Sequence, residues 1–526
     1  MNLSPSSIAS LSQPSKCERR TWLKDVEKLK PAPNDGFAEF IIEQGLRHEA
    51  EVLERLRADF SKLDVVDLGP LKHPEAVKRT SELVAQGDTL IYQAHLESQA
   101  SVEGEEVTLV GYPDFLIPEG GGWIIGDAKL VRSIHKQGND GTLKEKSDKK
   151  AIFHQLRLYG WLFEQTFPGI PFQLRVYNGS GEIETVDYKG ATEPFSELAR
   201  VLAIRKLESE PSEIVGWTKC NPCGFRERCW PRAVEDEELG YIVDITAGLG
   251  KRLLDAGYNS YPEVRKQLDE RQLAGIKSPS AGPDNQSNRD GARRILENIE
   301  AVESGQSIRR KDSNGDLIKI AASVSSDENY VMFDLEGLPP DRDEAEKVYL
   351  WGMQVFGRDK GDFIAALADF GVEGDRNGWE EFLRQSRSLL LDNPGIRFVH
   401  WHSYEKTRIN QYIKRFGDDS HGTASDVLDA LLDLLPITKA AVAVPAPSYS
   451  LKVIEKLSEV KAISGFARTA DEVAKGDDSI AAYIEAIETN DMARRTEIVD
   501  AILAYNQEDL EATWAVQLWL QQLAGK

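Results

Sequence analysis

Residues 107–131 read VTLVGYPDFLIPEGGGWIIGDAKLV, two apolar runs separated by a glycine-rich break. Runs rich in β-branched and aromatic residues, here 107–118 and 122–131, are typical of strands. Glu119, Gly120 and Gly121 between them supply a turn. We therefore predict that this stretch forms a β-hairpin.

The hairpin gathers two carboxylates and an amine. With Ile117 paired with Trp123, Asp114 lies next to Asp127 on the neighbouring strand. Asp127 and Lys129 are two residues apart, so both side chains leave one face of the strand. Such a cluster suits a divalent metal with a lysine that orients water. The alternative is an exposed polar face of an ordinary sheet.

Two predicted helices can complete this cluster. Residues 45–56 (GLRHEAEVLERL) carry an apolar stripe with His48 and Glu49 at its edge. In residues 151–165, Gln155 and Tyr159 are four apart and share a helix face. A lone helical histidine is more often structural than a ligand, and the Gln–Tyr pair alone indicates little.

Taken in order, these segments carry a resemblance. GLRHE (45–49), GYPD (111–114), GDAK (126–129) and QLRLY (155–159) resemble the RecB-like branch of the PD-(D/E)XK nucleases over most of residues 1–235. The resemblance implies that His48, Asp114 and Asp127 hold a metal ion and that Lys129 supports the attacking water. It also implies that Gln155 and Tyr159 contact the substrate backbone near the site.

The four cysteines are Cys17, Cys220, Cys223 and Cys229. Buried thiols and a zinc site are the alternatives, but zinc ligands usually come as two close pairs. One cysteine far upstream of a group of three resembles the iron–sulfur subset of RecB-like nucleases. The resemblance implies a 4Fe-4S cluster that staples the two ends of the domain together and contributes to folding.

A second carboxylate cluster follows. In NYVMFDLEG (329–337), alternation places Asp334 and Glu336 on one strand face, and residues 347–356 are predicted to form the antiparallel partner. RFVHWHSYEK (397–406) is predicted to be a strand that runs into a helix, with Glu405 near the junction.

Tyr505 and Asp509, four apart on a C-terminal helix, share one face. A strand Asp-x-Glu with a carboxylate from each of two helices is a ligand set for a two-metal phosphodiesterase, in which Tyr505 orients water. The alternative is solvated helix charges and a core tyrosine.

This pattern resembles the tyrosine-containing DEDD 3′–5′ exonucleases of the RNase H-like fold, over roughly residues 325–522. Glu405 stands where that family has an aspartate. The segment SYSLK (448–452) resembles predicted RecB-like nucleases that carry this second domain, and no catalytic role is assigned to Lys452.

Between the two clusters, residues 243–257 contain a Gly-x-Gly that resembles the turn of helix-hairpin-helix modules, which hold a DNA phosphate. A purely structural glycine turn is the equal alternative. Residues 277–291 are predicted to be an exposed connection between helices.

Composition bounds the class of protein. The chain has 526 residues and a net charge of −23, and 41% of its residues are hydrophobic. At roughly 150 residues per domain, about three domains are expected. No apolar run has membrane-span length, no signal peptide is evident, and four cysteines cannot form a secreted disulfide framework. We therefore expect a cytoplasmic protein.

The predicted architecture is α/β multidomain. It comprises a restriction-endonuclease-like nuclease core with the iron–sulfur cluster (1–238), a helical helix-hairpin-helix-like connector (239–314) and an RNase H-like exonuclease domain (315–526). The resemblances imply a DNA nuclease dependent on Mg²⁺ or Mn²⁺ that acts in repair, recombination or foreign-DNA processing, with a helicase or another repair or defence protein as partner. Two alternatives stay open: a nucleic-acid-binding scaffold with one inactive site, and a nuclease acting on RNA.

Overall fold

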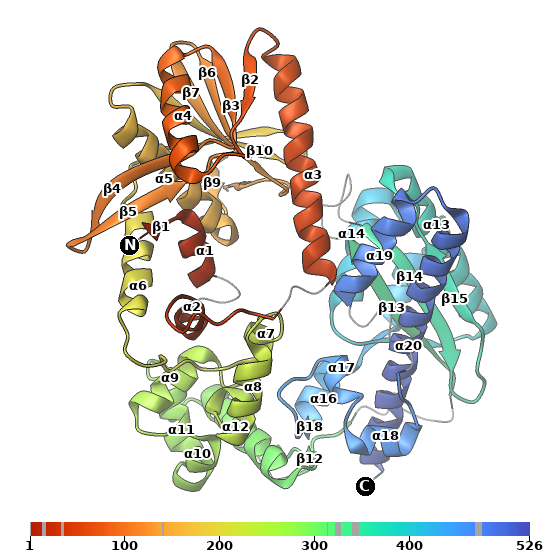
Figure 1. Ribbon diagram of the computed structural model, residues 1–526. Coiled ribbons are helices and arrows are strands. Elements are labelled where there is room, and N and C mark those ends of the chain that lie inside the picture. The colour runs from red at the N-terminus through yellow and green to blue at the C-terminus, as the bar shows by residue number, and fades with distance from the viewer. Residues whose placement is uncertain are drawn as a thin grey trace. The chain divides into compact units, whose positions relative to one another are not determined.

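The computed structural model divides the chain into two compact units (Figure 1). The first comprises residues 1–213 and 223–225, and the second comprises 214–222 and 226–526. The structure describes residues 2–12, 17–32, 36–138, 141–312, 314–320, 328–338, 347–468 and 476–525. None of the helices described there has the length and apolar character needed to cross a membrane.

The first unit is built on a six-stranded mixed sheet in the order β11-β10-β7-β6-β3-β2, and β1, β5 and β4 form a second, smaller sheet. Its elements are β1 (Asn2–Leu3), α1 (Pro5–Ser12), α2 (Glu18–Asp25), α3 (Gly36–Asp59), β2 (Asp64–Asp67), α4 (His73–Gln86), β3 (Thr89–Tyr92), β4 (Leu96–Val102), β5 (Glu105–Gly111), β6 (Phe115–Glu119), β7 (Gly122–Lys129), β8 (His135–Gln137), β9 (Leu143–Glu145), α5 (Lys150–Thr166), β10 (Phe172–Asn178), β11 (Ile183–Val186) and α6 (Thr192–Arg205).

Alternation along β7 explains how helices cover both faces of this sheet. Ile124 packs in one core cluster with Val52 and Leu53 of α3, whereas the ring of Trp123 contacts Phe163 of α5. Successive strand residues point to opposite faces, so α3 and α5 lie on opposite sides of β7. The two helices that carry the predicted site residues therefore flank the hairpin strands.

The predicted hairpin is present, but its register differs from the prediction by one residue. Ile117 pairs with Ile124 rather than Trp123, and Glu119 pairs with Gly122. Gly120 and Gly121 both have positive φ (61° and 83°), which a two-residue type I′ turn requires. In this register Phe115 pairs with Gly126, and Asp114 and Asp127 are the next residues along the two chains.

The predicted strand 107–118 is two strands. β5 ends at Gly111 and β6 begins at Phe115, and they belong to different sheets. Pro113 lies at the break, where its missing N–H prevents continuous pairing. Asp114 therefore stands at the start of a strand.

The second unit contains a helical part and a five-stranded sheet. Its elements are α7 (Trp217–Cys220), α8 (Arg226–Glu235), α9 (Ala247–Asp255), α10 (Tyr261–Gln267), α11 (Glu270–Lys277), α12 (Gln286–Ser304), β12 (Ile308–Arg309), β13 (Tyr330–Leu338), β14 (Lys347–Phe356), β15 (Phe363–Leu367), α13 (Gly371–Asp392), β16 (Arg397–His400), α14 (Tyr404–Phe416), α15 (Thr423–Ala430), β17 (Leu431–Asp433), α16 (Leu434–Ala441), β18 (Val442–Ala443), α17 (Leu451–Ile454), α18 (Ser458–Ser464), α19 (Gly476–Glu488) and α20 (Met492–Ala524).

The helical part, α9–α12, has its own apolar core. The predicted Gly-x-Gly turn is wrong, because Gly248 and Gly250 lie inside α9, which begins after the N-cap Thr246. Gly250 provides close packing, since a Cβ there would come within 2.9 Å of Ile214. Arg252 donates to the main-chain carbonyls at the end of α11, which is a structural role.

The five-stranded sheet has the order β15-β14-β13-β16-β17, antiparallel up to β13 and parallel beyond it. Along β13, Val331 and Phe333 pack in the cluster that contains Trp379 of α13. Met332 packs in the opposite cluster, which contains Trp519 of α20. Even-numbered residues of β13 therefore face α20, and this parity positions the second site.

Two candidate active sites

The first site lies where β6 begins and β7 ends. Asp127 is fully buried, and Lys129 Nζ lies 2.5 Å from its Oδ2. Asp114 Oδ2 accepts a hydrogen bond of 2.8 Å from the Ala128 N–H. The structure thus brings together the two carboxylates and the amine that the hairpin pattern predicts.

The charges of this site are unbalanced. Burial, and then the charge of Asp127, raise the pKa of Asp114 well above its ordinary value. Burial lowers the pKa of Lys129, but attraction to Asp127 and Asp114 outweighs this effect and raises that pKa overall. Asp127 Oδ1 is buried and accepts no hydrogen bond from the described residues. Buried, repelling carboxylates with an oxygen to spare fit a divalent cation.

On α3, His48 Nε2 lies 3.1 Å from the main-chain oxygen of Tyr177 and donates to it, and among the described residues His48 forms no close three-residue metal-ligating group with Asp114 and Asp127. The neighbouring Glu49 accepts a 2.8 Å hydrogen bond from the Tyr92 hydroxyl. Its charge also contributes to raising the pKa of both Asp114 and Lys129. Glu49 is therefore an additional acidic group of the site, which the sequence analysis placed on the helix edge without a role.

On α5, Gln155 Nε2 donates to the Tyr159 hydroxyl over 2.8 Å. Tyr159 is buried, and burial followed by the charge of Asp127 raises the pKa of this phenol well above its ordinary value. Gly111 permits the approach, because a Cβ there would lie 2.9 Å from the Tyr159 ring. Both predicted helix residues are thus on the Asp127 side of the sheet.

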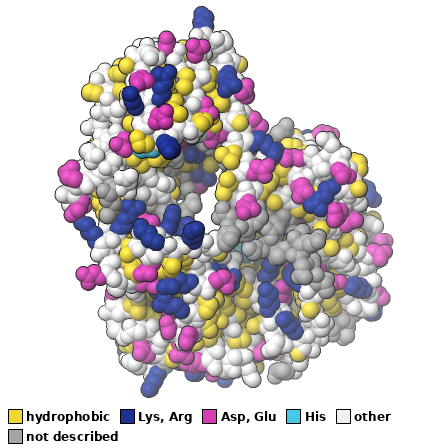
Figure 2. All heavy atoms as spheres, viewed as in Figure 1, with side chains coloured by type: hydrophobic (Ala, Val, Ile, Leu, Met, Phe, Trp, Pro, Cys, Tyr) yellow, Lys and Arg dark blue, Asp and Glu magenta, His cyan; other side chains and the backbone are white. Residues whose placement is uncertain are grey.

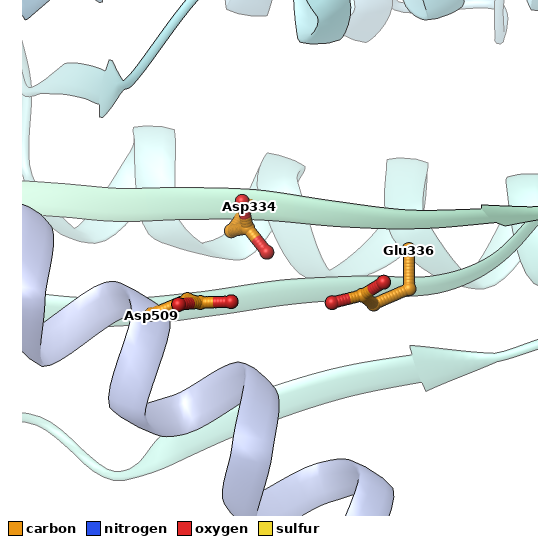
Figure 3. A group of neighbouring side chains, drawn as sticks. All are labelled: Asp334, Glu336 and Asp509. Atoms are coloured by element: carbon orange, nitrogen blue, oxygen red, sulfur yellow. The ribbon is translucent and has the colours of Figure 1, made fainter. Parts of the chain in front are cut away.

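The second site is on the α20 side of β13. Asp334 and Glu336 leave one strand and Asp509 leaves α20, and their side chains meet (Figure 3). One oxygen of each lies within 4.8 Å of the others, and among the described residues this is the only such three-residue group of metal-ligating side chains. The Asn506 amide donates to Asp334 Oδ2 over 2.8 Å.

Crowding of these carboxylates in a buried place governs their protonation. Burial, and then the charge of Asp509, raise the pKa of Glu336 to about 8 and that of Asp334 well above its ordinary value. Three crowded carboxyl groups cannot all ionise without a counterion, and a hard divalent cation is the counterion that carboxylate oxygens bind. The residues of this site therefore fit Mg²⁺ or Mn²⁺.

Glu405 is buried beside the site but outside the three-residue group. His400 Nδ1 lies 2.9 Å from Glu405 Oε2 and 2.6 Å from the main-chain oxygen of His402, so Nδ1 carries the proton and donates. The charge of Glu405 contributes to the raised pKa of Asp334. The structure thus places Glu405 within electrostatic reach of the group, with one carboxylate oxygen already occupied.

Two matches to known protein families cover most of the chain. A profile of the PD-(D/E)XK nuclease superfamily matches residues 7–230, and a profile of the RNase H superfamily matches residues 331–521. The chain carries a PD-(D/E)XK nuclease domain followed by an RNase H-like domain. A search of curated proteins gave no match.

Among solved structures, SSO0001 matches at 14% identity with a TM-score of 0.24, covering 43% of this chain and 85% of its own. A structure named "Putative exonuclease", from Eubacterium rectale, matches at 17% identity with a TM-score of 0.26, covering 40% of this chain and 84% of its own.

Sequence reasoning missed two cations of the RNase H-like site. Lys452 Nζ donates to the hydroxyl of Tyr505, and Arg468 binds both Asp509 and Glu455. Lys452 lay in the SYSLK segment that resembled this family, so a signal existed. No sequence signal pointed to Arg468, because it does not lie in a recognisable strand or helix pattern.

The cysteines do not form a metal group within the described part of the chain, where the carboxylates of the RNase H-like domain make the one such group. Cys17 and Cys223 belong to the first unit, whereas Cys220 and Cys229 belong to the second. The iron–sulfur cluster therefore rests on the sequence alone.

Proposed function

We propose that this protein is a metal-dependent DNA nuclease with two active sites, a RecB-like site in the PD-(D/E)XK domain and a DEDD-type exonuclease site in the RNase H-like domain. The observation that carries the proposal is the convergence of Asp334, Glu336 and Asp509 within 4.8 Å in an RNase H-superfamily domain. DNA repair, recombination or foreign-DNA processing is the proposed setting.

In the PD-(D/E)XK site, Asp114 and Asp127 would hold Mg²⁺ or Mn²⁺, with His48 as the further ligand that the resemblance implies. The bound ion would lower the pKa of a water molecule and polarise the phosphate. Lys129, 2.5 Å from Asp127, would orient the attacking water and stabilise charge that develops on the phosphate. Gln155 and Tyr159 would contact the substrate backbone, since they lie on the same side of the sheet.

In the RNase H-like site, Asp334, Glu336 and Asp509 would hold the metal, with Glu405 as the predicted further ligand. The hydroxyl of Tyr505 would orient the attacking water. Tyr505 suits this role as a neutral phenol, because burial and the charge of Asp509 keep its pKa far above neutral pH.

We further propose that Cys17, Cys220, Cys223 and Cys229 bind one 4Fe-4S cluster. What supports this is the one-plus-three cysteine order around a PD-(D/E)XK domain. Its role would be structural.

The test is cleavage of end-labelled DNA in Mg²⁺ or Mn²⁺ by wild type, Lys129→Ala, Asp334→Ala and the double variant. We expect each single variant to lose one activity and the double variant to lose both. Lys136→Ala and Asp255→Ala, which change exposed residues, are the matched controls. If wild type and all variants were equally inactive, the enzyme proposal would fail.

A second candidate is that the RNase H-like domain only binds nucleic acid. The hydrogen bond that ties Glu405 to His400 favours it, because it occupies an expected ligand oxygen. Loss of all cleavage in Lys129→Ala, with normal cleavage in Asp334→Ala, would show that the RNase H-like site does not cut. Matched DNA and RNA substrates, digested side by side, decide whether the substrate is RNA.

A further inference from the structure

A cavity of about 320 Å³ lies in the second unit, between the helical part and the RNase H-like domain. Arg294 of α12 and Lys439 of α16 line it, and the remaining polar lining is Asp244, Arg310 and Tyr449. The rest of its lining is a proline and an alanine of α16. Cavities of roughly 300–1,000 Å³ with a few polar groups on an apolar wall are typical of small-molecule sites.

Arg310 makes one wall of this cavity rigid. Its side chain is 2% exposed, so the guanidinium must find its partners within the protein. Its five N–H groups donate to Glu297, to Asn298, to the Tyr449 hydroxyl and to the main-chain oxygens of Arg294 and Lys439. Glu297, 2.5 Å away, balances its charge. Arg310 therefore fixes Tyr449, α12 and α16 around the cavity and has no donor left for a ligand.

The side chains of Arg294 and Lys439 are free, in contrast to that of Arg310. Both are exposed to solvent, and among the described residues neither side chain forms a hydrogen bond or an ion pair. Lys439 Nζ lies 5.8 Å from the centre of the Tyr449 ring. Asp244 supplies one negative charge against these two cations, so the lining has one positive charge in excess.

These groups fit a phosphorylated ligand that is larger than phosphate itself. A phosphate group carries up to two negative charges, and arginine and lysine are the side chains that bind its oxygens. The volume exceeds what a phosphate alone would fill. Asp244 can accept from a hydroxyl or an amine, and the Tyr449 ring offers an aromatic surface. A sugar and a base supply the matching groups.

We propose that this cavity binds a nucleoside monophosphate, with Arg294 and Lys439 on the phosphate. The ligand is either a free nucleotide or the phosphorylated end of a strand. Tyr449 stands three residues before Lys452, which contacts the Tyr505 hydroxyl, so one short segment reaches both the cavity and the RNase H-like site. The inference goes beyond the proposed function and does not depend on cleavage by either domain.

The test is calorimetry on the full-length chain in EDTA, with deoxyadenosine 5′-monophosphate, deoxyadenosine and inorganic phosphate as separate probes. We expect one monophosphate per chain, bound more tightly than either of its parts. Arg294→Gln and Lys439→Gln should each weaken its binding by roughly tenfold, because each removes one charged contact. Lys266→Gln, an exposed lysine of α10 in the same helical part, is the matched control and should bind normally.

Two further probes identify the source of the phosphate. Binding of a 5′-phosphorylated tetranucleotide, weakened by Arg294→Gln and absent for its 5′-hydroxyl form, assigns the cavity to a strand end. Binding of the mononucleotide alone assigns it to a free nucleotide.

Three results would overturn the inference: no binding of the monophosphate, binding unchanged in Arg294→Gln and Lys439→Gln, or equal binding of deoxyadenosine. Asp334→Ala should bind the monophosphate normally, and loss of binding there would refute a site separate from the carboxylates. Because EDTA removes the metal that the proposed nuclease needs, this inference and the proposed function fail independently.

Discussion

Glu336 links metal binding to protonation. Its pKa is raised to about 8 by burial and by Asp509, so at neutral pH the metal-free site holds a proton that the unfolded chain has already lost. The folded state then binds more protons than the unfolded state between pH 4.5 and about 8. The contribution of Glu336 to the free energy of unfolding of the metal-free protein therefore falls as pH rises through this window.

We predict that Glu336→Gln removes part of this decline. The contribution of one such group is at most about 1.4 kcal/mol per pH unit. Urea unfolding in EDTA at pH 5.5, 7 and 8 measures it, and Glu51→Gln, on the exposed side of α3, is the matched control. A decline equally steep in Glu336→Gln would show that Glu336 titrates normally.

For single residues, strand alternation suffices to bring Asp334 and Glu336 to one face of their strand. Helical spacing likewise brings Tyr505 and Asp509 to one face of their helix. Lys452 and Arg468 could not be placed in the same way. Their positions depend on how the segments between β18 and α20 pack, and that packing has no periodic signal. The occupied oxygen of Glu405 was also invisible, because it depends on the ring orientation of His400.

At the scale of elements, α20 and β14 are held at short range. Gly352 on β14 pairs with Asp334, and a Cβ at Gly352 would overlap the side chain of Asn506 on α20. Asn506 in turn donates to Asp334. The absence of a side chain at position 352 is what lets the helix bring Asp509 to the strand.

Gly352→Ala should therefore push α20 away from β13 and β14. We expect a loss of about 1–3 kcal/mol in the free energy of unfolding, as for other overpacked cores, together with weaker Mn²⁺ binding at this site. Gly275→Ala, inside α11 with only ordinary contacts around its Cβ, is the control and should leave Mn²⁺ binding unchanged. Normal Mn²⁺ affinity in Gly352→Ala would contradict this account of the packing.

The elements themselves were largely predictable. The strand pair β13–β14, the strand-to-helix junction before Glu405 and the helices with His48 and Tyr159 follow from clear periodicity. The register of the hairpin could not be predicted from the sequence, because it depends on whether two or three residues form the turn. The prediction of a turn at residues 248–250 was wrong, because glycine also occurs where a helix packs closely against a neighbouring segment.

At the scale of the whole molecule, the question is where the acidic side chains lie. On the face shown in Figure 2, acidic and basic side chains are interspersed, so the net charge of −23 is not gathered there in one patch. The acidic groups proposed to act in catalysis include Asp127, Glu336 and Asp509, which are buried. A bound cation reverses the local sign where a phosphate must sit.

The cysteines give a prediction at the same scale. Protein purified without oxygen should be brown and contain about four iron and four sulfide per chain, the composition of one 4Fe-4S cluster. Cys223→Ala should lower the unfolding midpoint more than it alters cleavage by the folded fraction, because the cluster is proposed as a staple. Asp334→Ala should keep its iron. Colourless protein with one zinc per chain would refute the cluster.

The crowded carboxylates of the two domains have a consequence for the lifetime of the protein. Each metal-free site stores electrostatic repulsion that a bound cation relieves. A ligand that binds only the folded state at a hundred times its Kd adds about 2.7 kcal/mol to stability. The protein would then unfold more often, and be degraded sooner, when divalent metal is scarce. Its abundance would follow the supply of the divalent ion proposed for its two sites.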